Sequence, residues 1–159
     1  MMKITAFDPD EEEEVCAFVL AIQNGEFNLG FTVQEQPDLR NIRQFYQGGG
    51  FWTAKISGTL VGTIGLQGLD RENGVLRKMF VHQAYRGHAL KVAQQLFNTL
   101  LTEASLLDFH YLLLDTPAIA KASHRFYEKN DFVEITKDQA PEAYQYPDRN
   151  SKIYRLTLK

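Results

Sequence analysis

The fold is decided by residues 76–101, in which a short apolar strand leads into Gln83-Ala84-Tyr85-Arg86-Gly87-His88-Ala89-Leu90-Lys91 and then directly into a long amphipathic helix. A strand that stops at a tight, glycine-containing turn and opens a helix leaves several backbone N–H groups unpaired, with the positive end of the helix dipole behind them. Arg86 and Lys91 place positive charge beside the same spot. The sequence therefore predicts a cradle for a diphosphate group that belongs to a cofactor.

Chain length and composition indicate one ordinary soluble domain, residues 1–159, that can bury a core without metal or disulfide bonds. The formal charge of -3 gives no general attraction to nucleic acid or to an anionic membrane. No apolar run approaches the roughly 18 residues of a membrane span, and no targeting segment is evident, so the cytoplasm is the expected location. Neither nucleic acid nor a membrane is expected as a partner.

Cysteine and histidine usage points away from metal or thiol chemistry. The one cysteine, Cys16, lies beside an apolar helix face and is predicted to be a small buried thiol rather than a nucleophile. His82 and His88 flank the cradle, whereas His110 and His124 are expected to be ordinary surface or helix residues. No pair of His, Cys or carboxylate residues has the spacing of metal ligands, so no metal is predicted.

Hydrophobic periodicity and turn residues predict the element order βααβββαβαββ, a mixed α/β fold with seven strands and four helices. The polar residues 137–150, which include two prolines, are expected to form a surface loop. The predicted strands cover residues 3–7, 51–56, 60–66, 75–81, 111–114, 132–135 and 151–158, and the predicted helices cover 9–22, a short segment from 37, a helix after the cradle that extends to about 104, and 119–130.

The middle of this order predicts a slot in the sheet. An antiparallel meander feeds a β-α-β crossover, and a right-handed crossover brings the strands at Val75 and Tyr111 side by side in parallel. If these fourth and fifth strands diverge at their carboxyl ends, the gap between them is a slot, and binding sites of open α/β sheets occur at such places.

Four pieces of this sequence resemble the core of the GNAT superfamily of acetyl-coenzyme A-dependent N-acetyltransferases. The resemblance is strong over about a third of the chain, residues 76–132, and the order and spacing of the pieces match that family. It implies a mostly antiparallel sheet of about seven strands with four helices, splayed between the fourth and fifth strands. The pieces are Leu76-Arg77-Lys78-Met79-Phe80-Val81, Tyr85-Arg86-Gly87, Leu114-Asp115-Thr116 and the run from His124 to Phe132.

The resemblance also implies a set of residues for acetyl-coenzyme A, the expected co-substrate. Met79, Phe80 and Val81 would line the pantetheine arm, with the backbone of the first and third pairing with it like a strand. Two departures from the family pattern stand in the diphosphate loop, where Ala89 and Lys91 occupy positions that the family keeps small. The residues assigned to the diphosphate are Arg86, Gly87, His88, Ala89, Leu90 and Lys91.

Tyr127 falls on the family's catalytic tyrosine, which protonates the departing thiolate. This chemistry is reasonable by itself, because a thiol leaves better when a phenol donates a proton to it. Packing beside Phe126 is the alternative role for Tyr127. Ala120 stands where family members often have an asparagine that contacts the cofactor, and Asp131 replaces a glycine but still tolerates a left-handed turn.

An amine acceptor must lose a proton before it can attack, so the site needs a base. Asp115 is the best placed candidate for this base, and Asp70 and Glu72 are weaker candidates. Asp115 has a structural alternative as a helix cap. The resemblance places the acceptor, a small molecule or peptide, beside the link between the first two helices, where carboxylates such as Glu26 would suit a cationic amine.

The leading hypothesis is therefore an N-acetyltransferase that moves an acetyl group from acetyl-coenzyme A to a primary amine by direct attack in a ternary complex. The alternative is a non-catalytic coenzyme A-binding or regulatory module, which the departures at Ala89, Lys91 and Ala120 favour. A nucleotide-binding α/β domain is disfavoured, since antiparallel strands precede the cradle. The acceptor's identity and the oligomeric state, including a homodimer, stay open.

Overall fold

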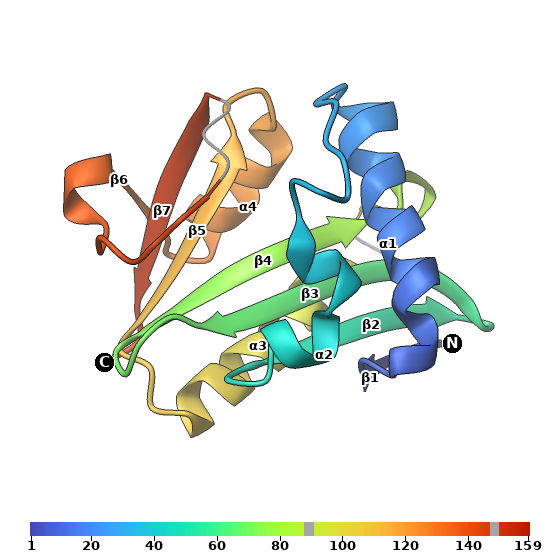
Figure 1. Cartoon of the computed structure of the whole chain (residues 1–159), viewed down its shortest axis with the longest axis horizontal. Helices are drawn as coiled ribbons and strands as arrows, with labels where there is room; N and C mark the ends of the chain where they lie inside the picture. Colours follow the sequence, from blue (N-terminus) through green and yellow to red (C-terminus); the bar gives the residue numbers. More distant parts are fainter. Residues whose placement is uncertain (88–90, 147–149) are drawn as a thin grey trace.

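The computed structural model describes residues 1–87, 91–146 and 150–159. These described residues form one mixed seven-stranded sheet in the order β1-β2-β3-β4-β5-β7-β6, with four α-helices (Figure 1). The predicted number and order of elements are confirmed. The strands are β1 Met2–Ala6, β2 Gly50–Ile56, β3 Thr59–Gly68, β4 Asn73–Val81, β5 Tyr111–Pro117, β6 Val133–Ile135 and β7 Ser151–Thr157, and the helices are α1 Glu12–Leu20, α2 Ile42–Phe45, α3 Val92–Leu106 and α4 Lys121–Lys129.

Strands β1 to β4 form an antiparallel meander, as expected. The β2–β3 hairpin turns at Ser57 and Gly58, both with positive φ, which a tight hairpin turn requires. Before β2, the backbone at Gly49 lies so close to β3 that a Cβ atom there would be 2.0 Å from the Leu66 carbonyl oxygen. Gly49 thus allows the chain to pass close to β3 as it enters the sheet.

Strands β4 and β5 are parallel and pair only over Asn73–Val75 against Tyr111–Leu113. Beyond Val75 the two strands diverge, whereas β5 stays paired with β7 along its whole length (Figure 1). The sheet is therefore split along the carboxyl-terminal part of β4, and the predicted splay between the fourth and fifth strands is confirmed.

Helices cover both faces of the sheet (Figure 1). On one face, Val15 and Val19 of α1 and Ile42 of α2 pack with Phe51 and Leu60 of the sheet. On the other face, α3 and α4 pack over β3, β4 and β5 in the largest buried cluster. Apolar side chains at helical spacing explain why α3 lies flat against the sheet. The split between β4 and β5 opens between these two helical layers.

A β-bulge interrupts β4 at Lys78, whose φ of 53° is left-handed, opposite a register shift between Thr63 and Gly65 of β3. The Lys78 carbonyl oxygen turns out of the ladder and accepts a hydrogen bond from the Thr63 hydroxyl at 2.7 Å. A bulge of this kind bends a strand and redirects its side chains. It lies where β4 separates from β5.

Two local expectations were wrong in detail. The first helix extends beyond its predicted end at residue 22, as a π-helix over Ala21–Glu26. His124 is a helix residue of α4, as expected, and is buried with Nε2 2.9 Å from the Pro117 carbonyl oxygen. The segment 137–150 contributes to the core through buried Tyr144, because aromatic area outweighs the polar composition around it.

The structure agrees with the expectations for Cys16 and Asp131. Cys16 is buried, and burial raises the pKa of its thiol, as expected for an inert packing residue. Asp131 has a φ of 73°, the left-handed turn expected there. Among the described residues, no helix has both the length and the apolar character needed to cross a membrane.

Candidate functional site

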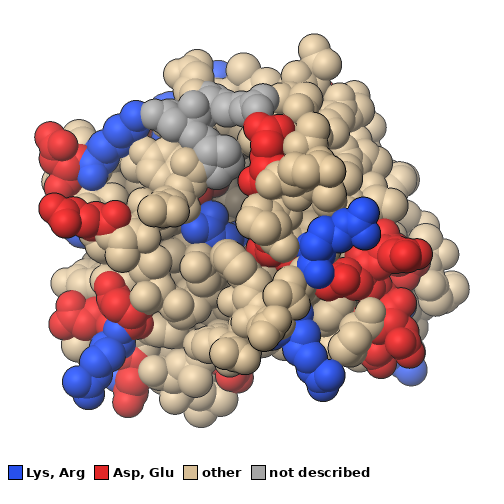
Figure 2. Space-filling view, viewed as in Figure 1, with Lys and Arg blue, Asp and Glu red and all other residues tan. Residues whose placement is uncertain are grey.

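A hollow of about 500 Å³ occupies the split between β4 and β5. On the face seen in Figure 2, a depression opens between the β5–β7 pair and the segment that links α1 to α2, and Lys or Arg atoms form part of its floor. Two strands line the hollow, through residues 76–81 of β4 and 115–117 of β5. Residues 119 and 120 before α4 and residues 121–123, 126 and 127 of α4 form another part of the lining. The first helical layer and the segment after α1 contribute Gln23, Glu26, Phe27, Leu29, Phe31 and Gln36.

The β5-facing edge of β4 is the long wall of this slot. Met79, Phe80 and Val81 all line it, and none of them pairs with β5. A strand edge without a strand partner can accept an extended chain of amide groups as an added strand. The three β4 residues assigned to the pantetheine arm therefore lie together on a wall that suits such an arm.

The turn after β4 brings Arg86 and Gly87 to the end of that wall. Gly87 has a φ of 124°, which only glycine adopts readily, and α3 begins at Val92 with its first amides free of helical partners. Lys91 is exposed, has a left-handed φ of 50° and immediately precedes α3. The predictions for His88, Ala89 and Leu90 lie outside the described residues.

Arg86 makes an ion pair that the sequence did not reveal. Its two terminal nitrogens donate to the two carboxylate oxygens of Glu26, and Nε donates to the Val81 carbonyl oxygen at 2.9 Å. The hydrogen bond with Arg86 lowers the pKa of Glu26. This pair joins the π-helix to the end of β4, and it leaves Glu26 already compensated rather than available for a cationic amine.

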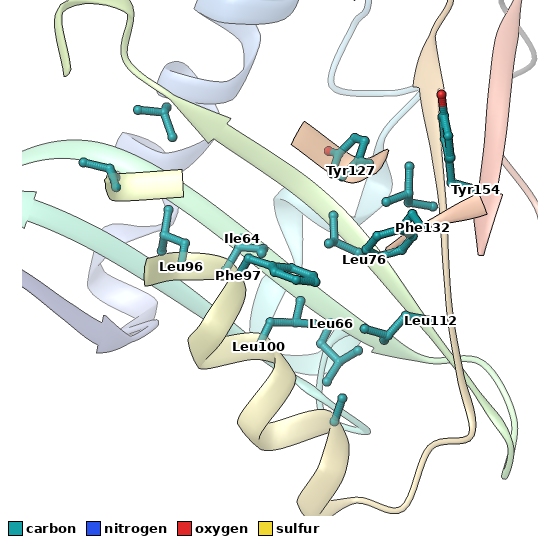
Figure 3. Packing of buried hydrophobic residues seen from close by; sticks show 14 of the residues in the cluster. Ile64, Leu66, Leu76, Leu96, Phe97, Leu100, Leu112, Tyr127, Phe132 and Tyr154 are labelled. Carbon is teal, nitrogen blue, oxygen red and sulfur yellow. The ribbon is translucent and has the colours of Figure 1, made fainter. Parts of the chain in front are cut away.

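Tyr127 comes from α4 and lies in the split. Its ring packs against Phe126, Phe132 and Tyr154. In Figure 3 its oxygen points away from Phe132. The hydroxyl donates to Met79 Sδ across the slot at 3.9 Å, a weak contact. Burial raises the pKa of Tyr127, so the phenol keeps its proton at neutral pH.

Asp115 is near the end of β5, on the same slot. One carboxylate oxygen accepts a hydrogen bond from the Tyr144 hydroxyl at 2.6 Å. Burial raises the pKa of Asp115, whereas this hydrogen bond and the charges of Arg77 and Lys78 lower it. The alternative role as a helix cap is wrong, because the residue at the N-cap of α4 is Ala120 and no side chain caps that end.

A buried charged pair joins β4, at the slot-lining residue Lys78, to Asp38 of the 3-10 helix Pro37–Arg40. Lys78 Nζ lies 3.5 Å from Asp38 Oδ2, the oxygen that also accepts the Tyr46 hydroxyl at 2.7 Å. Burial lowers the pKa of Lys78. Sequence reasoning missed this pair, although two adjacent charges inside an apolar strand, Arg77 and Lys78, were a signal that the strand is irregular.

The other base candidates lie elsewhere. Asp70 accepts hydrogen bonds from the backbone of Glu72 and Asn73 in the β3–β4 turn, at the opposite end of β4 from Arg86. His82 Nδ1 accepts from the Ala84 amide and orders the turn after β4. The described part of the chain contains no cluster of three or more His, Cys, Asp or Glu side chains arranged to hold a metal ion.

Sequence comparison agrees with this geometry. The profile of the Acetyltransferase (GNAT) family matches residues 10–132. The chain belongs to the GNAT acetyltransferase family. Among curated proteins of the same kind, the N-acetylaspartate synthetase of Xenopus tropicalis is 33% identical over 102 residues, 62% of this chain. The chain spans little more than a third, 37%, of the length of that protein.

Two solved bacterial structures of GNAT acetyltransferases match nearly the whole chain. The acetyltransferase from Streptococcus agalactiae 2603 is 34% identical, with a TM-score of 0.94 over 99% of this chain and 98% of that one. The GNAT-family acetyltransferase from Staphylococcus aureus MU50 is 33% identical, with a TM-score of 0.95 over all of both chains. The family resemblance in the sequence is thus confirmed for the fold as well.

Proposed function

We propose that this GNAT protein transfers the acetyl group of acetyl-coenzyme A to the primary amine of a small molecule or peptide, by direct attack in a ternary complex. The observation that carries the proposal is the position of the Tyr127 hydroxyl, which faces the unpaired edge of β4 across the split. A thioester aligned along that edge would have a phenol beside its sulfur.

The cofactor side of the slot supports this proposal. The backbone of Met79 and Val81 would pair with the pantetheine amides, and Arg86, Gly87 and Lys91 would surround the diphosphate at the start of α3, with His88, Ala89 and Leu90 assigned to the same group. Backbone amides and a helix N-terminus favour phosphate because both present positive dipole ends. The apolar wall of β4 excludes water from the acyl group.

Acetyl-coenzyme A supplies an acetyl thioester as the acyl donor. The neutral amine nitrogen attacks the thioester carbonyl carbon, so that a C–N bond forms and the C–S bond breaks. Tyr127 donates its proton to the departing sulfur, a role for which its burial and raised pKa keep it protonated. We assign to Asp115, whose carboxylate lies on the facing strand, the removal of the proton that keeps the amine an ammonium ion before the attack. The second proton, lost from nitrogen as the amide forms, returns to the Tyr127 oxygen.

Relatives make an N-acetyl product a reasonable expectation. The similar Xenopus protein is named for synthesis of N-acetylaspartate, in which the acetyl group is on nitrogen. Because this chain covers only 37% of the Xenopus protein, the acceptor of that protein cannot be assigned directly to this chain. The reaction type is the part of the comparison that supports the proposal.

Isothermal titration of the purified protein with acetyl-coenzyme A tests the proposal. We expect saturable binding with one site per chain, followed by thiol release when an amine acceptor is added. Absence of measurable heat at millimolar ligand would refute the proposal. Binding with desulfo-coenzyme A provides a control, because it keeps the diphosphate contacts and lacks the sulfur that faces Tyr127.

A non-catalytic coenzyme A-binding module is the second candidate. It is favoured by Ala120, which lines the slot with a methyl group where a cofactor-contacting amide side chain would be expected. Such a module would bind acetyl-coenzyme A in the titration but release no thiol with any amine. Thiol release above the rate of spontaneous hydrolysis would exclude it.

A further inference from the structure

The acceptor end of the slot has two basic side chains on one face of β4. Consecutive residues of a regular strand point to opposite faces. The bulge at Lys78 breaks this alternation, and Arg77 and Lys78 both line the hollow. The backbone irregularity of β4 therefore concentrates positive charge at this end of the slot.

Among the described residues, the hydrogen-bond partners of Arg77 are neutral groups. Its Nε donates to Gln67 Oε1 at 2.7 Å, its Nη2 donates to the Gln145 carbonyl oxygen at 2.8 Å, and its guanidinium carbon lies 5.7 Å from the centre of the Tyr144 ring. Within the parts of the chain described, no carboxylate lies within ion-pair distance of it. An arginine has five N–H donors, so several remain for a ligand in the hollow.

Lys78 adds a second charge beside Arg77. It shares Asp38 with the Tyr46 hydroxyl, and its side chain is 12% exposed. Asp38 is thus occupied by Lys78, and Glu26 is occupied by Arg86. A polyamine or another acceptor with a second positive charge would bring that charge against Arg77 and Lys78.

Asp115 and Tyr127 lie on the same hollow, and the Tyr144 side chain that donates to Asp115 also lies under the Arg77 guanidinium. The Asp115 charge acts on the phenol of Tyr127 as well as on Lys78. The negative charge of Asp115 and the positive charges of Arg77 and Lys78 are close enough to act on one another, so this part of the hollow matches a molecule in which an amine and a carboxylate lie near each other. This pairing of opposite charges, rather than the total charge, is the selective feature.

We propose that the acceptor is a small amine that also bears a carboxylate, the amino-acid class, and that the Arg77 guanidinium binds this carboxylate. This inference rests on the proposed acetyl transfer and specifies its acceptor. Arginine binds a carboxylate through two parallel N–H donors, which fixes orientation as well as affinity. With the carboxylate held at Arg77, the amine points toward Asp115 and the thioester.

The experiment compares matched acceptors that differ only in the carboxylate. Thiol release from acetyl-coenzyme A is measured with L-aspartate, L-glutamate, glycine and L-alanine, with the corresponding carboxamides, and with spermidine and a peptide N-terminus. We expect at least one free acid to be used at least 10-fold better in kcat/KM than its carboxamide, the size expected for one charge-assisted contact. The dicarboxylic acids report whether Lys78 provides a second carboxylate contact.

Arg77→Gln removes the charge and keeps a polar side chain, and Arg77→Lys keeps the charge without the planar pair of donors. We expect Arg77→Gln to raise KM for the acid by roughly 10- to 100-fold and to abolish the preference for acid over carboxamide. Kd for acetyl-coenzyme A should stay unchanged. Arg43→Gln on the exposed surface of α2 is the matched control.

The outcomes separate this inference from the reaction itself. If spermidine or the peptide is acetylated and the free acids are not, the inference fails and acetyl transfer stands. If acids and carboxamides are used equally, or Arg77→Gln keeps the preference while circular dichroism shows native folding, Arg77 does not bind the acceptor carboxylate. A protein that acetylates none of these amines overturns both the inference and the proposed function.

Discussion

The two ends of the slot are built in opposite ways. At the end where we propose that the cofactor binds, the turn after β4 and the start of α3 are consecutive in the chain, and an exposed ion pair with Glu26 of the π-helix holds Arg86. The acceptor end collects buried charges from β4, β5 and the first helical layer, such as the pair of Lys78 and Asp38. A cofactor shared across a family can be bound by a local backbone motif, whereas an individual acceptor requires side chains from distant segments.

The ion pairs at the two ends of the slot also differ in how much they contribute to stability. An exposed ion pair contributes little, because water screens it and two long side chains lose freedom. A buried pair is costly to break, because the partner left behind is a charge without hydration. Predictions about the two ends therefore differ in size, and the largest concern the acceptor end.

Asp38→Asn should give the largest effect, a loss of about 3 kcal/mol in the free energy of unfolding at neutral pH. The substitution leaves the Lys78 ammonium buried without its carboxylate. Urea denaturation measures it. Adding Lys78→Met to Asp38→Asn should recover most of the loss, and a loss below 1 kcal/mol in the single variant would show that the pair is as weak as a surface pair.

Tyr127→Phe should lower kcat about 100-fold, since the acid for the leaving sulfur is removed. Kd for acetyl-coenzyme A should change less than twofold, because the ring packing is retained. Steady-state kinetics with calorimetry separate the two quantities. Tyr154→Phe is the control, as it loses only a hydroxyl that donates to Glu128 at 2.8 Å. Equal loss of turnover and cofactor affinity would reduce Tyr127 to a packing residue.

Tyr144→Phe should move the acid limb of the kcat/KM profile to higher pH. The Tyr144 hydroxyl lowers the pKa of Asp115, so its removal raises that pKa further and the carboxylate is lost at higher pH. The pH profile of thiol release measures the shift. Tyr146→Phe, a neighbour whose ring stacks on Tyr144, should leave the limb in place. An unmoved limb in Tyr144→Phe would remove Asp115 as the base.

Glu26→Gln should give the smallest effect, about 0.5 kcal/mol of unfolding free energy, which disappears in 1 M salt. The Arg86 hydrogen bond lowers the pKa of Glu26 from its usual 4.5, so the stabilisation is present above that pH and is lost as the pH falls through the lower folded pKa. Denaturation of both proteins from pH 7 to pH 3 should show the difference shrink. A difference that persists at pH 3 would contradict this ion-pair account.

Local signals predicted the turn between β4 and α3 well. Gly87 with its positive φ, the strand before it and the helix after it are all encoded within about 25 consecutive residues, where periodicity and turn preference act directly. The splay of β4 from β5 followed from element order, because a crossover between parallel strands has a fixed hand.

Local signals failed at the acceptor end. Tyr144 belongs to a polar segment and becomes buried only because β5 and β7 provide an apolar face for it. The contacts of Arg77 with Gln145 and of Lys78 with Asp38 join residues that are far apart in the chain. The sequence around Arg77 or Lys78 does not show whether the side chain contacts a residue far away in the chain or water.

By itself, the sequence determined the number and order of the elements, the turn that precedes α3 and membership of the family, since each depends on neighbouring residues or on hydrophobic periodicity. The tertiary structure alone decided which charges are buried, which are paired and which face the slot. Burial and ion pairing depend on distances between segments remote in sequence, and those distances exist only after the sheet has formed and β4 has bulged at Lys78.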